Sequence, residues 1–101
     1  MSAQVVRGEQ GMIALQGQLD FSSAMQVRQQ LQQSLADVTG DITLDLSGVE
    51  HANSVGLALI LFVARAVSVR GDQLRVIGLP AGLQSIAQVC ELEDWLTTLA
   101  A

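Results

Sequence analysis

The sequence predicts an α/β domain in which a small mixed β-sheet of about four strands is flanked by helices. Two observations predict this class. After an initial hairpin, strand-like and helix-like segments alternate along the chain, an order that gives parallel strands joined by right-handed crossovers. In the segment 42–46, apolar and polar side chains also alternate, which indicates a strand buried on one face only. We therefore expect the helices to lie mainly on one face of the sheet.

The first three elements are a hairpin and a helix. Residues 3–7 and 12–17 are strand-like, and the segment Gly8-Glu9-Gln10-Gly11 between them is typical of a turn. The segment Asp20-Phe21-Ser22-Ser23 predicts a helix start. The apolar residues that follow at helical spacing, before Gly40 ends the helix, are Ala24, Val27, Leu31, Leu35 and Val38.

The later elements repeat the strand–helix order. They are a strand at 42–46, a loop at 47–53, a helix at about 54–69, a strand at 74–77 and a helix that begins near Pro80. The apolar face predicted for this last helix comprises Leu83, Ile86, Ala87 and Cys90. This spacing places Cys90 in the core. The tail, Glu91 to Ala101, is expected to pack back on the core.

Composition limits the possible functions. The 101 residues form a single predicted domain, 1–101, and 50% hydrophobic against 15% charged residues exclude intrinsic disorder. A formal net charge of -5 argues against nucleic-acid binding, which needs clustered cations. One Cys and one His exclude an internal disulfide and the Cys-rich or all-imidazole metal sites, so we expect no metal and no cofactor.

Neither a membrane segment nor catalytic machinery is predicted. The first twenty residues lack the apolar region of a secretory signal, and the apolar stretch 55–64 is shorter than the ~20 residues that a membrane span needs. We therefore expect a cytoplasmic chain without direct membrane insertion. The chain has no phosphate-binding loop and no G-x-S-x-G motif, and His51 and Ser54 are too close in sequence to pair as base and nucleophile. An enzyme is not expected.

The predicted helix at 54–69 is unusual because residues 55–64 include no polar side chain. One apolar stripe should face the sheet, and its candidates are Leu57, Ile60, Leu61 and Ala64, followed by either Val67 or Ser68. This assignment leaves five further apolar residues facing elsewhere: Val55, Leu59, Phe62, Val63 and Ala66. Either neighbouring helices cover this second face, or it binds a partner protein.

The segment from His51 to Gly56 lies where a strand ends and a helix begins, a place where ligands and partners commonly meet α/β sheets. Asn53 or Ser54 can cap the helix. Ser54 is alternatively an exposed hydroxyl whose phosphorylation would add negative charge, and Gly56 would allow a partner backbone to approach. We expect loop N–H groups to bind the nearby Asp45 carboxylate.

Three segments resemble a known family, the STAS domains of anti-sigma-factor antagonists and transporters. They are Gly17-Gln18-Leu19-Asp20, Asp45-Leu46-Ser47-Gly48-Val49 and Asn53-Ser54-Val55-Gly56-Leu57. The resemblance covers nearly the whole chain. It implies a mixed four-stranded sheet with flanking helices and a binding module without catalysis of its own.

Two branches of this family suggest different partners. In anti-sigma-factor antagonists, the serine that Ser54 matches is phosphorylated by a partner kinase, although Asn53 here replaces the preceding Asp. In the other branch, a minimal STAS subunit of the Mla phospholipid ABC transporter binds the ATPase, and through it a membrane permease complex. A hydroxyl residue at the position of Ser54 is important there for binding the ATPase, and the apolar helix is similar.

We favour the transporter branch, because a permanent subunit tolerates a hydrophobic interface better than a partner that must dissociate. The resemblance then implies a peripheral position at the inner membrane and a role in outer-membrane lipid asymmetry. The predicted partner-binding residues are His51, Asn53, Ser54, Val55, Gly56, Leu59, Phe62 and Val63, with Ser54 also a candidate phosphorylation site. The alternative is an anti-sigma-factor antagonist regulated at Ser54.

Overall fold

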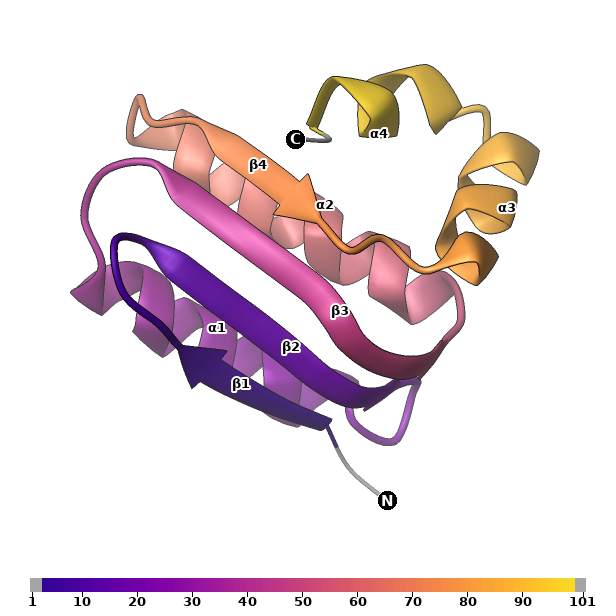
Figure 1. The fold of residues 1–101 in the computed structure, drawn as a ribbon, viewed down its shortest axis with the longest axis horizontal. Coiled ribbons are helices and arrows are strands. Elements are labelled where there is room, and N and C mark those ends of the chain that lie inside the picture. The colour runs from indigo at the N-terminus through magenta and orange to yellow at the C-terminus, as the bar shows by residue number, and fades with distance from the viewer. Residues whose placement is uncertain (1–2, 100–101) are drawn as a thin grey trace.

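A four-stranded mixed β-sheet forms the centre of the computed structural model, which describes residues 3–99 (Figure 1). The strands lie in the order β1-β2-β3-β4. They are β1 (Ala3–Arg7), β2 (Met12–Leu19), β3 (Ile42–Ala52) and β4 (Leu74–Ile77). The hairpin strands β1 and β2 are antiparallel, whereas β2–β3 and β3–β4 are parallel. The mixed sheet confirms the fold class predicted from the sequence.

The two long helices cover one face of this sheet (Figure 1). They are α1 (Ala24–Asp37), which connects β2 to β3, and α2 (Ser54–Val69), which connects β3 to β4. The shorter α3 (Ala81–Val89) packs against α2, and α4 (Glu93–Leu99) packs against α3 and β4. Since each long helix joins two parallel strands, α1 and α2 run in the same direction. None of the helices in residues 3–99 has the length and apolar character needed to cross a membrane.

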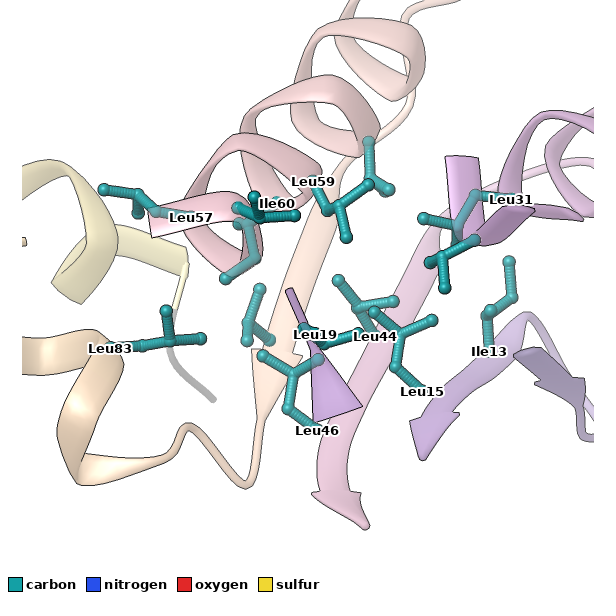
Figure 2. Packing of buried hydrophobic residues seen from close by; sticks show 14 of the residues in the cluster. Ile13, Leu15, Leu19, Leu31, Leu44, Leu46, Leu57, Leu59, Ile60 and Leu83 are labelled. Atoms are coloured by element: carbon teal, nitrogen blue, oxygen red, sulfur yellow. The ribbon is translucent and has the colours of Figure 1, made fainter. Parts of the chain in front are cut away.

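The core lies between the sheet and the two long helices. Ile42, Leu44 and Leu46 are at most 1% exposed, whereas Thr43 and Asp45 between them are half-buried on the opposite face. Figure 2 shows Leu15, Leu44 and Leu46 of the strands directed toward the side chains of α2 and α1. The alternation in residues 42–46 therefore predicted the buried face correctly, because only one face of the sheet carries the long helices.

The strand β3 is longer than predicted. Residues 47–52, expected as a loop, continue it beside β2, where Gln16 pairs with Gly48 and Leu19 pairs with Ala52. The pairing shifts register between Ala14 and Gln16 and again between Gly17 and Gln18. Such irregularities interrupt the alternation of inward and outward side chains, so the pattern that marks a strand is lost over this stretch.

The end of α3 also differs from the prediction. Cys90, expected in the core, is exposed. The helix ends at Val89, and the chain then turns through Glu91, which has a φ of 59°. This turn ends the helical spacing, and Leu92 packs against the core instead.

The predicted packing of the tail is confirmed for residues 91–99. They contain the whole of α4, in which Leu96 is buried. Residues 100 and 101 lie outside the described part of the chain. Within residues 3–99, no three His, Cys, Asp or Glu side chains gather closely enough to hold a metal ion.

Candidate partner-binding surface

The start of α2 is fixed by Asn53. Its side-chain Oδ1 accepts a hydrogen bond from the N–H of Val55 at 2.8 Å, which is the N-cap arrangement. The sequence left open whether Asn53 or Ser54 caps the helix, and the structure assigns this role to Asn53. Ser54 is exposed at the N-terminal end of the helix, where the helix dipole is positive. Its hydroxyl is therefore accessible to a partner or to a phosphate group.

His51, near the end of β3, is exposed and pairs with Gln18 of β2. Asp45, expected beside the loop that precedes α2, instead lies in the first half of β3. It is half-buried and accepts a hydrogen bond at 2.9 Å from the N–H of Ser47, which belongs to the strand and not to the expected loop. His51, Asn53 and Ser54 thus form one edge of a surface at the carboxyl end of β3.

The buried and exposed residues of α2 differ in part from those predicted. Leu57, Ile60 and Val67 are buried as expected, but Leu61, expected to face the sheet, is 40% exposed. Conversely, Leu59 and Val63, expected to face away from the sheet, are 5% and 0% exposed and belong to the core. The reason is that α2 packs against both α1 and α3 as well as the sheet, so its buried arc is wider than one stripe.

Four predicted contact residues therefore lie inside the domain, namely Leu59 and three others. Val55 and Gly56 are buried at the first turn of α2, and Val63 is fully buried further along. Gly56 packs against α3 of the same domain, because a Cβ at this position would lie 3.0 Å from Cδ2 of Leu83. The close approach that Gly56 permits is therefore the approach of α3.

A groove of about 500 Å³ runs between α1 and α2 on the surface away from the sheet. We call it the α1–α2 groove. Phe21 and Met25 on its α1 side are 79% and 76% exposed, and Phe62 on its α2 side is half-buried. The lining residues are Phe21, Ala24, Met25, Arg28, Val55, Ala58, Leu59, Leu61, Phe62 and Arg65. This is a mainly apolar surface bordered by two cations, and it begins next to Ser54.

Arg28 crosses the groove toward α2. Its guanidinium carbon lies 4.9 Å from the centre of the Phe62 ring, within the range of a cation–π interaction. This contact keeps the charge of Arg28 at the surface and next to apolar side chains. Phe62, a predicted contact residue, is thereby held in the wall of the groove.

The turn before α1 places Phe21 at the mouth of the groove. The carboxylate Oδ1 of Asp20 accepts hydrogen bonds from the Ser22 hydroxyl at 2.6 Å and from the N–H groups of Ser22 and Ser23. The hydrogen bond from the Ser22 hydroxyl is the main reason that the pKa of Asp20 lies below its ordinary value, and the two backbone N–H groups lower it further. Partial desolvation of the carboxylate acts in the opposite direction. The ionised carboxylate therefore stabilises the turn.

We expect this turn to give the domain an acid-dependent stability. Because folding lowers the pKa of Asp20, its contribution is complete above the unfolded-state pKa of about 3.9 and is lost as the pH falls through the lower folded-state value. The difference in free energy of unfolding between wild type and Asp20→Asn should be constant above about pH 5 and shrink below about pH 4. Urea denaturation at several pH values measures it.

The control for this measurement is Glu9→Gln, which removes an exposed carboxylate from the β1–β2 turn. Its stability difference from wild type should change little over the same pH range. A difference for Asp20→Asn that does not shrink in acid would contradict the proposed role of the ionised carboxylate.

Comparison with known families identifies the domain. The family model described as "Mlab, STAS domain" matches residues 2–99. The chain belongs to this STAS family. No curated protein matches the chain.

Solved STAS structures share the fold. The unphosphorylated anti-sigma factor antagonist SpoIIAA superposes with a TM-score of 0.72 at 16% identity, over 98% of this chain and 87% of that one. The phosphorylated form of SpoIIAA, a Bacillus cell fate determinant, gives 0.72 at 14% identity, with 98% and 88% covered. An anti-sigma factor antagonist from Mycobacterium paratuberculosis gives 0.70 at 18% identity, with 96% and 93% covered. At these identities the likeness concerns the fold alone.

Most of the groove in this STAS domain was not predicted from the sequence. Val55, Leu59 and Phe62 were predicted contact residues, but Phe21, Met25 and Arg65 were not. A signal was available, because Met25 and Arg28 are three positions apart on one face of α1 and Phe21 precedes Met25 by four residues. This face was overlooked because the prediction followed only the buried stripe of the same helix.

Proposed function

We propose that this STAS domain is a non-catalytic subunit that binds the ATPase of an Mla-type phospholipid ABC transporter. In this role it supports assembly and activity of the complex, is held at the cytoplasmic side of the inner membrane through the ATPase and permease, and contributes to outer-membrane lipid asymmetry. The observation that carries the proposal is the α1–α2 groove beside Ser54, where Phe21, Met25 and Leu61 are exposed. Large apolar side chains clustered on a small domain are typical of a protein-binding surface.

The matching family description supports the choice of the transporter branch. The interface proposed for the ATPase comprises His51, Asn53 and Ser54 together with the exposed wall of α2 that includes Phe62. Of the four buried residues in the predicted set, Val55 and Leu59 line the groove, whereas Gly56 packs against α3 and Val63 lies in the core. The apolar character of the groove favours a partner that stays bound, because a hydrophobic surface of this kind is costly to expose.

One observation favours the second candidate, an anti-sigma-factor antagonist. Ser54 is exposed at the N-terminal end of α2, where a phosphate group would be stabilised by the helix dipole. Phosphorylation would add about -1.5 to -2 charge to this surface and could release an anti-sigma kinase. In that case Ser54→Asp should abolish binding to the kinase, and Ser54→Ala should make it constitutive.

The two candidates are separated by co-purification. The affinity-tagged chain is isolated from its native cells after solubilisation of membranes in mild detergent, and bound proteins are identified by mass spectrometry. We expect an ABC ATPase with its permease. Ser54→Arg should lower the affinity for the purified ATPase by at least about tenfold, because the larger charged side chain blocks the edge of the interface.

The matched control is Thr39→Arg. Thr39 is exposed in the connection from α1 to β3, and so lies near the opposite end of β3 from Ser54. This variant should bind the ATPase like wild type. Recovery of an anti-sigma kinase with phosphate on Ser54, and of no ATPase, would replace the transporter proposal by the second candidate.

A further inference from the structure

The charges around the α1–α2 groove are opposite to the charge of the whole chain. The formal net charge is -5, yet the groove is lined by Arg28 and Arg65 and by no Asp or Glu. Among residues 3–99, the ion pairs are Arg7–Asp37 and Arg70–Asp72, so neither groove arginine is neutralised by a described residue. The groove therefore carries a local positive charge that the fold itself leaves without a counter-charge.

Each wall of the groove carries one arginine, Arg28 as the fifth residue of α1 and Arg65 as the twelfth residue of α2. On the α1 side, Met25 and Arg28 lie three positions apart on one helical face, and Phe21 lies in the turn just before the helix. On α2, Ala58, Leu61, Phe62 and Arg65 follow i, i+3, i+4 and i+7. Since both helices run in the same direction, each wall begins with apolar side chains and ends in a guanidinium.

On the other wall, the span from Ala58 to Arg65 is two turns of α2, or about 10 Å along the axis. A groove of this length between two helices fits an amphipathic helix of a partner, which would insert apolar residues spaced at i, i+3 or i+4 and i+7. Arginine binds carboxylates with paired hydrogen bonds, so acidic residues beside that apolar face would meet Arg28 and Arg65.

We propose that the α1–α2 groove binds an acidic amphipathic helix of the partner protein, with Arg28 and Arg65 pairing with its carboxylates. The proposal rests on the proposed function, since it takes the ATPase as the source of this helix. A second copy of the chain fits less well, because a two-fold contact through this groove would bring the arginines of both copies together. An anionic membrane surface fits less well too, because it would repel the net negative charge of the domain.

The first test reverses the charges. The affinity of the purified ATPase is measured by isothermal titration calorimetry for wild type, for Arg28→Glu/Arg65→Glu and for the control Arg7→Glu/Arg75→Glu. Arg7 and Arg75 are also exposed but lie outside the groove, and both double variants change the net charge equally. We expect binding at least about 100-fold weaker for the groove variant, and within about threefold of wild type for the control.

Raising the ionic strength should change the affinity for the ATPase in opposite directions for wild type and for the groove variant, Arg28→Glu/Arg65→Glu. Raising NaCl from about 50 mM to about 500 mM should weaken wild-type binding, because salt screens the attraction. The same change should strengthen binding of the groove variant, because salt then screens a repulsion. Similar affinities for wild type and the groove variant would overturn the proposal, while loss of binding by Ser54→Arg would still support the ATPase as partner.

The second test identifies the occupant. A photoreactive phenylalanine analogue replaces Phe21, which is 79% exposed, and the cross-linked peptide from the ATPase complex is sequenced. We expect a helical segment of the ATPase with at least two Asp or Glu residues beside an apolar face, and reversal of these residues to Arg should restore binding of the groove variant. A cross-link to a second copy, to lipid or to a segment without acidic residues would overturn the proposal. Failure of the ATPase to co-purify would instead overturn the proposed function.

Discussion

Leu61→Asp is expected to fold and to lose the ATPase complex, whereas Leu59→Asp is expected not to fold. The two residues are two positions apart on α2, but Leu61 is 40% exposed and Leu59 is 5% exposed. A carboxylate at position 61 remains in water, costs about 1 kcal/mol or less in stability and places a charge in the apolar wall of the groove. We expect the ATPase to bind this variant at least about 100-fold more weakly.

At position 59 the carboxylate would be buried without a partner. This lowers the free energy of unfolding by about 4 kcal/mol or more, which is most of the stability of a domain of this size. Circular dichroism with urea denaturation measures folding, and calorimetry with the purified ATPase measures binding. The conservative variant Leu61→Met should match wild type in both. Full ATPase binding by Leu61→Asp would show that the groove is outside the interface.

Gly11→Ala is expected to destabilise the domain far more than Gly71→Ala. The two glycines have nearly the same backbone conformation, with φ values of 79° and 84°. A Cβ at Gly11 would overlap the backbone oxygen of Asp41, whereas a Cβ at Gly71 would meet nothing within 4 Å. Both variants carry the cost of a positive φ, about 1 kcal/mol, but only Gly11→Ala must also move backbone.

The contact at Gly11 joins the β1–β2 turn to the start of β3. The carbonyl of Gly11 accepts a hydrogen bond from the N–H of Thr43 at 3.0 Å, so a displaced turn also weakens the pairing of β2 with β3. We expect Gly11→Ala to lower the free energy of unfolding by about 3 kcal/mol and Gly71→Ala by about 1 kcal/mol. Urea denaturation measures both values. Equal losses would mean that the turn moves away from Asp41 without cost.

Local pattern was sufficient where a segment has one partner layer. Residues 42–46 face the helices with one side only, and their alternation predicted Ile42, Leu44 and Leu46 as the buried set. The start of α2 was also predicted, with Asn53 or Ser54 as the N-cap, and Asn53 fills this role. In both cases the signal depends on residues a few positions apart.

Local pattern was not sufficient where the burial of a residue depends on segments distant in the sequence. No pattern within α2 shows that α3 covers Gly56 through Leu83, or that α1 and α2 together bury Leu59 and leave Leu61 exposed. The end of α3 at Val89 likewise removed Cys90 from the core, although its spacing matched a buried face. Periodicity gives the direction of a side chain around its own helix, but not which neighbours stand there.

By itself, the sequence determined the order of the elements, the parallel crossovers and the family segments at Asp45–Val49 and Asn53–Leu57. These features follow from short-range propensity, capping and patterning, which each segment carries independently. Only the tertiary structure decided that Met25 and Arg28 of α1 line one groove with Phe62 and Arg65 of α2. The physical reason is that a surface shared by two helices is set by how they pack on the sheet, and neither helix encodes this arrangement alone.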